Sequence, residues 1–173
     1  MLKIKINGKN IKAKEGATVL DVARANGIDI PTLCSNDALK SYGACRMCIV
    51  EVEQNKRTTI EAACTFPVAE GMSVKTNSER VIAGRKLVIE LLLSRCPNVK
   101  VVQDLAREYG VADSSTEWEK ENEYCILCGL CVRACNEVVG ASAIQFAGRG
   151  VDKVVDSPFH QSAEDCIACG SCA

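Results

Sequence analysis

Eleven of the twelve cysteines in this 173-residue chain fall into three closely spaced sets. The sets are Cys34, Cys45, Cys48 and Cys64; Cys125, Cys128, Cys131 and Cys135; and Cys166, Cys169 and Cys172. Thiols at this density either pair as disulfides or bind metal, so they constrain the fold more than any other feature. The N-terminus has no secretory signal, and Glu90 interrupts the longest apolar stretch well short of a membrane span. We therefore expect a cytoplasmic protein, in which dense cysteines are metal ligands or redox groups.

The rest of the composition narrows the classes of function. The net charge is −1, so no nucleic-acid partner is indicated, and 25% charged with 47% hydrophobic residues is usual for a globular protein. The sequence has no glycine-rich phosphate loop, no Ser-His-Asp pattern and no convincing pair of carboxylates. The single histidine, His160, is expected to be a solvated loop residue. We therefore predict no catalytic residues and no site of the chain's own for NAD, flavin or an organic substrate.

Residues 1–77 are predicted to form a small β-rich unit. LKIKIN alternates with period two, Asn7-Gly8 signals a tight turn, and KNIKAK would be the returning strand. A helix capped by Thr18 and ended by Gly27 follows, and then three more strands in CIVEVE, TTIEAAC and MSVKT. This order predicts a mixed sheet with one helix packed across it.

The rest of the chain divides into a helical connector, a linker and a cysteine-rich unit. Residues 78–112 are predicted to form two helices, the first capped by Ser78 and the second ended by Gly110. The apolar stripe expected on the first helix consists of Val81, Ile82, Leu87, Val88, Leu91 and Leu92. Residues 113–121 are polar and acidic and are predicted to be the linker. Residues 122–173 contain the other two cysteine sets, separated by two short predicted strands about a Gly-Arg-Gly turn.

The first cysteine set has the spacing C-x10-C-x2-C-x15-C. Four thiolates can hold either Zn²⁺ or a [2Fe–2S] cluster. Zinc ribbons generally use two C-x2-C pairs, whereas this set has one, at Cys45 and Cys48. A two-iron cluster needs two sulfurs per iron, which one such pair and two outlying cysteines supply. The small residues Gly43 and Ala44 leave room for backbone amides to point at sulfur. The spacing favours the cluster and leaves zinc as the alternative.

These residues resemble a known domain. PTLC, YGACRMCIVEVE and AACTFPVAEGMSVKT are similar to the N-terminal domain of the large iron–sulfur subunit of respiratory complex I, which also occurs in the small iron–sulfur subunit of NAD-linked [NiFe] hydrogenases and in multimeric [FeFe] hydrogenases. The resemblance implies an α+β protein that begins with a β-grasp, ferredoxin-like domain. It also implies the ligands of one [2Fe–2S] cluster, which would be Cys34, Cys45, Cys48 and Cys64. Many members carry a further, His-ligated [4Fe–4S] cluster in the helical connector. Here Cys96 stands alone at that place, so we expect that cluster to be missing and Cys96 to be a buried structural thiol.

The second set, CILCGLCVRAC, has the C-x2-C-x2-C-x3-C spacing of bacterial ferredoxins with two [4Fe–4S] clusters. Gly129 permits a sharp turn, so the first three cysteines would bind one cluster while Cys135 points to the other. The first cluster would use Cys125, Cys128 and Cys131, and the other would use Cys135, Cys166, Cys169 and Cys172. The fourth ligand of the first cluster is expected three residues after Cys172, beyond the end of the sequence, which favours a truncated chain. Two structural zinc sites are the alternative.

The sequence thus predicts an electron-relay subunit of an oxidoreductase complex that has no substrate site of its own. By resemblance, its partner would be a flavin subunit that oxidises or reduces NAD(H) or NADP(H). The second partner would be a ferredoxin, a hydrogenase, a formate dehydrogenase or a second flavin in an electron-bifurcating complex of anaerobic metabolism. The alternatives are the N-terminal fragment of an [FeFe]-hydrogenase catalytic subunit and, in another class, a zinc-stabilised interaction module without a redox role.

Overall fold

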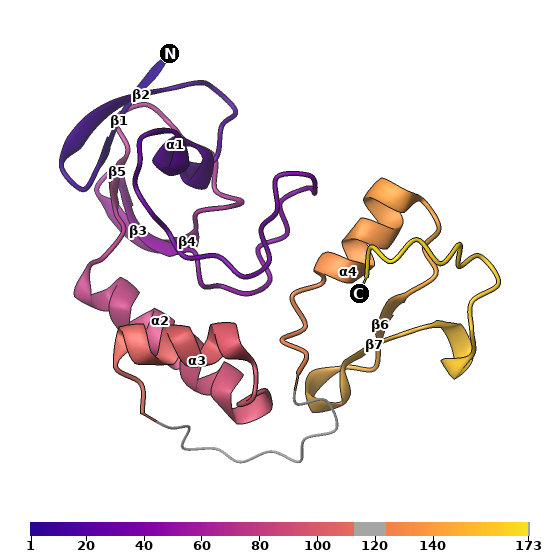
Figure 1. Cartoon of the computed structure of the whole chain (residues 1–173). Helices are drawn as coiled ribbons and strands as arrows, with labels where there is room; N and C mark the ends of the chain where they lie inside the picture. The colour runs from indigo at the N-terminus through magenta and orange to yellow at the C-terminus, as the bar shows by residue number, and fades with distance from the viewer. Residues whose placement is uncertain (113–123, 173) are drawn as a thin grey trace.

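The computed structural model describes residues 1–112 and 124–172, which form three parts along the chain. Figure 1 shows a sheet crossed by one helix, a pair of helices that follows it, and a C-terminal unit. The predicted linker, residues 113–121, lies outside the described residues and stays a prediction. Within the two described ranges, no helix has the length and apolar character needed to cross a membrane.

The N-terminal part is a five-stranded sheet. It contains β1 (Leu2–Ile6), β2 (Lys9–Ala13), β3 (Ile49–Gln54), β4 (Arg57–Ala62) and β5 (Ser73–Lys75), in the spatial order β2-β1-β5-β3-β4. The pair β1–β5 is parallel and the other three neighbouring pairs are antiparallel. The predicted strands and the predicted mixed sheet are confirmed, and so is the mixed α+β class.

One face of the sheet packs against α1 (Val19–Ala25) and forms the main core. In β1, Ile4 and Ile6 are buried while Lys3 and Lys5 are exposed, which is the period-two pattern of a strand with one covered face. The buried residues of α1 are Val19, Leu20, Val22 and Ala23. Because burying one valine or leucine side chain stabilises a fold by roughly 1.5–3 kcal/mol, this helix face fixes α1 to the sheet.

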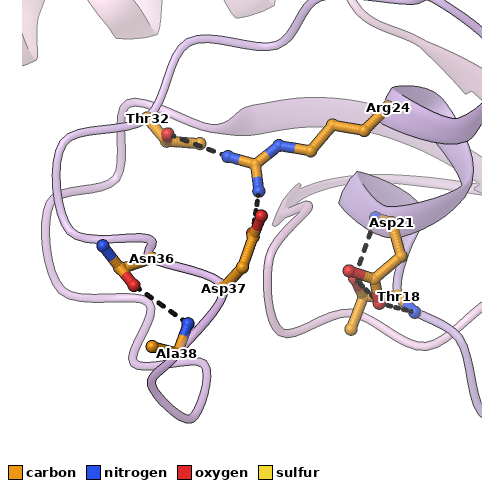
Figure 2. A network of polar contacts seen from close by, with 7 residues as sticks. All are labelled: Thr18, Asp21, Arg24, Thr32, Asn36, Asp37 and Ala38. Atoms are coloured by element: carbon orange, nitrogen blue, oxygen red, sulfur yellow. Dashed lines mark hydrogen bonds and ion pairs between the residues drawn. The ribbon is translucent and has the colours of Figure 1, made fainter.

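The start of α1 is held by a reciprocal capping box. Thr18 Oγ1 accepts a hydrogen bond from Asp21 N–H at 3.2 Å, and the Asp21 carboxylate accepts one from Thr18 N–H at 2.9 Å (Figure 2). In the first turn of the helix, Leu20 N–H donates to the carbonyl of Ala63 at 3.0 Å. The predicted Thr18 cap is confirmed, and the helix start is tied to the segment that carries Cys64.

The middle part is the helix pair α2 (Glu79–Arg95) and α3 (Lys100–Tyr109), which pack against each other. Ser78 caps α2 by accepting a hydrogen bond from Val81 N–H at 3.4 Å. Gly110 ends α3 in the left-handed conformation, with φ 65°. Both predicted helix boundaries are therefore confirmed.

The predicted apolar stripe of α2 is partly wrong. Leu87 and Leu91 are 57% and 45% exposed, whereas Arg85 is 1% exposed. The buried side of the helix runs along Val81, Arg85 and Ile89, at spacings of four residues. Arg85 can occupy this face because carbonyl and hydroxyl oxygens accept the hydrogen bonds of its guanidinium, as described below.

The C-terminal part contains α4 (Leu130–Arg133), which continues into a π-helical turn at Ala134–Val139. The strands β6 (Gln145–Ala147) and β7 (Val154–Asp156) follow as an antiparallel hairpin. Two strands about the Gly-Arg-Gly segment were predicted and are confirmed. His160 is exposed, as predicted, and its ring contacts the carboxylate of Asp156.

Glu51 on β3 gives the fold a pH-dependent contribution to stability. Its carboxylate accepts hydrogen bonds from Lys75 Nζ at 3.2 Å and Ser78 Oγ at 3.1 Å. The bond from Lys75 has the largest effect on the pKa of Glu51 and lowers it; burial opposes this shift, and the bond from Ser78 adds to it. Because the folded-state pKa lies below the unfolded one, this contribution is present above the unfolded pKa and is lost as the pH falls through the folded pKa.

We expect the Glu51→Gln substitution to remove this pH dependence. Between about pH 5 and pH 3, the urea midpoint of the iron-free chain should fall less steeply in the variant than in the original chain. Circular dichroism measures the midpoint, and the iron-free chain is used because acid releases iron. If the urea midpoints of the two chains fall equally with pH, Glu51 does not contribute to the pH dependence of stability.

Candidate metal centre

The fold brings the first cysteine set together from three segments of the chain. Cys34 lies in the long loop after α1, Cys45 and Cys48 lie in the loop that enters β3, and Cys64 follows β4. Cys34, Cys48 and Cys64 are buried, and Cys45 is half-buried. The sulfurs are arranged as two hydrogen-bonded pairs, in which Cys45 donates to Cys34 and Cys48 donates to Cys64.

Each pair contains one sulfur that ionises readily. The hydrogen bond from Cys45 lowers the pKa of Cys34 to about 5, and the bond from Cys48 lowers the pKa of Cys64 to about 7. The same two bonds, together with burial, raise the pKa values of the donors Cys45 and Cys48. The thiolate is the form of cysteine that binds metal, so one sulfur of each pair is ready for metal at neutral pH.

Backbone amides surround the same sulfurs. The backbone amides of Cys45 and Ala44 contribute to the lowered pKa of Cys34, and the amide of Gly43 contributes to that of Cys64. Amides of this loop therefore lie near two sulfurs of the set, as expected from the small residues Gly43 and Ala44. Such donors stabilise negative charge on sulfur, which raises the reduction potential of a bound cluster.

Gly43 is required at its place for two reasons. Its φ is +71°, which side-chain-bearing residues rarely adopt, and a Cβ there would lie 3.1 Å from Thr65 Cγ2. The loop therefore passes directly against the segment after Cys64. This close approach brings the Gly43 amide to the fourth sulfur of the set.

The four sulfurs of the first set lie as two pairs, Cys34 with Cys45 and Cys48 with Cys64. A structural zinc needs four ligands converging on one point, whereas a [2Fe–2S] cluster needs two sulfurs on each of two irons. The donor set and its geometry therefore fit the cluster.

An arginine from α1 braces the loop that carries Cys34. Figure 2 shows Arg24 reaching across to this loop, where its Nη1 lies 2.9 Å from Asp37 Oδ1 and its Nη2 lies 3.3 Å from Thr32 Oγ1. Asn36 tightens the same loop, because its side-chain oxygen accepts a hydrogen bond from the backbone N–H two residues further on. The segment around Cys34 is thus held from both sides.

A second arginine, Arg85 of α2, braces the loop that enters β3. Its Nε donates to the carbonyl of Met47 at 3.1 Å and its Nη2 to the carbonyl of Ile49 at 2.9 Å, on either side of the third cysteine. Its Nη1 donates to Asn77 Oδ1 at 3.2 Å and to the Tyr109 hydroxyl at 3.0 Å. The helical connector is therefore part of the framework of this site.

The second and third cysteine sets share a backbone conformation. Leu127 and Ala168, at equivalent positions of CILCGLC and CIACGSC, have φ values of 52° and 53°. The glycines two residues later, Gly129 and Gly170, have φ values of 73° and 74°. A left-handed conformation costs a residue other than glycine on the order of 1 kcal/mol, so its repetition indicates two loops of one shape. A Cβ on Gly129 would also lie 3.1 Å from the ring of Phe146.

The four cysteines predicted for one [4Fe–4S] cluster line a common cavity. This cavity, of about 60 Å³, is otherwise lined mostly by aliphatic side chains, and its cysteines are Cys135, Cys166, Cys169 and Cys172. The Cys135 sulfur accepts a hydrogen bond from Ala143 N–H at 3.3 Å. Three of these cysteines, those of the third set, are exposed.

The second cysteine set lies beside the loop of the first. Cys128 and Cys131 line a groove of about 450 Å³ together with Asn36, Ala38 and Leu39, which follow Cys34 in the sequence. Cys125, Cys128 and Cys131 are each half-buried. The second cysteine set and the loop that follows Cys34 therefore border the same groove.

The twelfth cysteine, Cys96, is a buried thiol, as predicted. It is 0% exposed, and its Sγ donates to the carbonyl of Leu92 at 3.0 Å. Burial raises the pKa of Cys96 to about 11, although the charge of Arg95 opposes this shift. A neutral thiol in this position packs as a small apolar side chain.

Replacing Cys96 with alanine is expected to lower the stability of the fold and to leave its iron content unchanged. Loss of one buried sulfur and its hydrogen bond should lower the free energy of unfolding by about 1–2 kcal/mol. Iron per chain, measured after anaerobic purification, should equal that of the original chain. A fall in iron content would show that Cys96 is a ligand after all.

Comparison with known proteins identifies the first part of the chain. Residues 1–79 match the family model described as "2Fe-2S iron-sulfur cluster binding domain". The chain contains a 2Fe-2S iron–sulfur domain. This 2Fe-2S domain holds all four cysteines of the first set and the whole five-stranded sheet.

The relatives extend beyond the 2Fe-2S domain. The chain is 36% identical to the NADP-reducing hydrogenase subunit HndD of Solidesulfovibrio fructosivorans and 32% identical to a subunit of the NADH-quinone oxidoreductase of Rhizobium meliloti, in both cases over 99% of its length. It spans 34% of the first relative and 23% of the second. A solved NAD⁺-reducing [NiFe]-hydrogenase superposes with a TM-score of 0.79 and 29% identity, covering 91% of this chain and 75% of that one. The predicted resemblance is therefore confirmed.

The two buried arginines around the 2Fe-2S site were missed from the sequence. Arg85 lies four residues from Val81 and from Ile89. An arginine on the same helix face as these apolar residues was the one feature of the sequence that could have indicated its burial. Arg133 lies between two cysteines of the second set, and only the fold shows that its side chain reaches Cys34.

Proposed function

We propose that the chain is an electron-relay subunit that holds one [2Fe–2S] cluster and two [4Fe–4S] clusters. Such clusters, when bound, supply one-electron transfer with little structural rearrangement. The observation that carries the proposal is the arrangement of four sulfurs as two pairs within a 2Fe-2S domain. The proposed ligands of the [2Fe–2S] cluster are Cys34, Cys45, Cys48 and Cys64.

The two [4Fe–4S] clusters are proposed for the C-terminal part. The cysteines that line the 60 Å³ cavity would hold one of them. Cys125, Cys128 and Cys131 would supply three ligands to the other. The repeated spacing and the matching φ values of the two loops support this assignment.

The chain's own residues fix positions and exclude water rather than move protons. Burial of three of the first-set cysteines keeps solvent away, and amides such as that of Gly43 stabilise charge on sulfur. Arg24 and Arg85 hold the two ligand loops in place. A rigid site of this kind needs little reorganisation when its charge changes by one.

A flavin subunit that oxidises or reduces NAD(H) or NADP(H) is proposed as one partner in the cytoplasm. The relatives are subunits of NADP-reducing, NAD⁺-reducing and NADH-linked enzymes, which supports this choice. A ferredoxin, a hydrogenase, a formate dehydrogenase or a second flavin would be the other partner, with electron bifurcation as one mode of the complex.

The test is to isolate the chain anaerobically with the polypeptides that co-purify with it. Adding NADH or NADPH should bleach the visible absorbance of the complex, while the separated chain should be bleached by dithionite and not by either nucleotide. A complex that dithionite bleaches but neither nucleotide affects would contradict the proposed relay from NAD(P)H.

A second candidate is that the chain is the relay segment of a hydrogenase subunit, which the identity to HndD favours. In that case H₂ should bleach the full-length gene product without any partner. A zinc-stabilised module is distinguished by metal analysis, because it would hold about three zinc ions in place of about ten iron atoms.

A further inference from the structure

Arg133 joins the second cysteine set to the first. Its Nη1 donates to the carbonyl of Lys40 at 2.6 Å, its Nη2 donates to the carbonyl of Cys34, and its guanidinium lies over the ring of Tyr42, 5.0 Å from the centroid. One turn later Glu137 accepts a hydrogen bond from Lys40 N–H at 2.8 Å. The helical segment that carries Cys131 and Cys135 thus bonds to the Cys34 loop through both the backbone carbonyl and the backbone amide of Lys40.

The charge of Arg133 is buried and has no carboxylate partner. The residue is 8% exposed, and among the described residues no aspartate or glutamate forms an ion pair with it. Its Nε–H, also buried, has no hydrogen-bond acceptor in the part of the chain that the structure describes. A buried cation is costly unless an anion compensates it, and an unpaired buried donor calls for a missing acceptor. An anionic iron–sulfur centre at either side would supply the compensating charge.

Arg24 shows what a merely structural arginine at the same loop looks like. It braces the Cys34 loop from the other side, but its side chain is 41% exposed and Asp37 neutralises it at 2.9 Å (Figure 2). Solvent and the carboxylate screen its charge from the sulfurs. Arg24 and Arg133 therefore both bond to the Cys34 loop, but only Arg133 brings to it a buried positive charge that no carboxylate of the described residues pairs with.

We propose that Arg133 is a positioning residue that sets the reduction potential of the [2Fe–2S] centre and fixes that centre next to the [4Fe–4S] motif of the second set. This inference rests on the proposed function, because it requires both sites to hold clusters. Adding an electron makes a cluster more negative, so a fixed positive charge in a low-dielectric position favours the reduced form. The same side chain sets the position of the Cys34 loop relative to Cys131.

The test compares the full chain with Arg133→Met, Arg133→Lys and the control Arg24→Met, in EPR-monitored redox titrations of the [2Fe–2S] signal. Arg133→Met should lower the equilibrium constant for reduction at least tenfold, which is about 59 mV toward negative potential for one electron. Arg133→Lys, which keeps the charge, and Arg24→Met should each stay within about threefold, or roughly 30 mV, of the original chain.

An unchanged potential in an Arg133→Met chain with its iron intact would overturn the inference. So would an Arg133→Lys shift as large as that of Arg133→Met, because a purely structural role would not distinguish the charge. If Arg133→Met loses iron, the Arg133→Lys chain decides the question. An equilibrium constant for reduction within threefold of that of the original chain supports the inference, and a tenfold lower constant contradicts it. Absence of a [2Fe–2S] signal from the original chain would instead overturn the proposed function.

Discussion

A Cys48→Ala chain purified without oxygen is expected to lack the [2Fe–2S] EPR signal completely. The Cys48 sulfur is buried and paired with Cys64, so its loss leaves one iron with a single protein ligand. The one cysteine not assigned to a set, Cys96, is buried and its Sγ donates to the Leu92 carbonyl within the helix pair, so it is not free to replace Cys48. Removal of one ligand should therefore remove the whole two-iron centre.

The matched control is Cys96→Ala, which removes a sulfur of equal burial outside the set. Its EPR signal should be that of the original chain, and both variants should keep the far-UV circular dichroism of a folded domain. The loss in Cys48→Ala is thus assigned to ligation rather than to misfolding. A full [2Fe–2S] signal from Cys48→Ala would show that the ligand set is different from the one proposed.

Arg85→Met is expected to lower the stability of the chain strongly. Methionine fills a similar volume but leaves the buried carbonyls of Met47 and Ile49 without their donors, and each unsatisfied buried group costs about 1–3 kcal/mol. We expect the free energy of unfolding to fall by about 3 kcal/mol, which corresponds to roughly 6–12 °C in Tm for a chain of this length. Anaerobic differential scanning calorimetry measures the shift.

Arg80→Met on the same helix is the control for this change. Its side chain is 62% exposed and lies 4.0 Å from Glu51, so its loss should cost less than about 0.5 kcal/mol. Iron per chain should also fall in Arg85→Met and not in Arg80→Met, because Arg85 fixes the residues on both sides of Cys48. Equal Tm values for the two variants would show that the buried guanidinium does not hold the loop.

The parts of the fold with local signals were predictable from the sequence. The alternation in LKIKI, the Thr18 and Ser78 caps and the glycine at 110 each act within a few residues, and each boundary is found where it was predicted. That the four cysteines of the first set come together was also predictable, because the spacing of ligands along the chain reflects the size of the centre they would bind.

The side chains that join the parts were not predictable in this way. Arg85 and Arg133 reach carbonyls 38 and 99 residues away in the sequence, and nothing local marks a carbonyl as an acceptor. Their burial also contradicts the average behaviour of arginine, so the stripe on α2 was assigned to leucines that in fact face solvent. Only the assembled fold shows that the ligand loops of the 2Fe-2S domain are braced from the helices that follow it.

The most direct test of the ligand assignment is the EPR spectrum of the anaerobically purified, dithionite-reduced chain, with iron and acid-labile sulfide measured on the same sample. We predict an S = 1/2 signal of a reduced [2Fe–2S] centre that persists at temperatures where [4Fe–4S] signals have broadened, in a protein rich in both iron and sulfide. A folded, colourless chain that contains zinc and gives no such signal would contradict the assignment of its four paired cysteines.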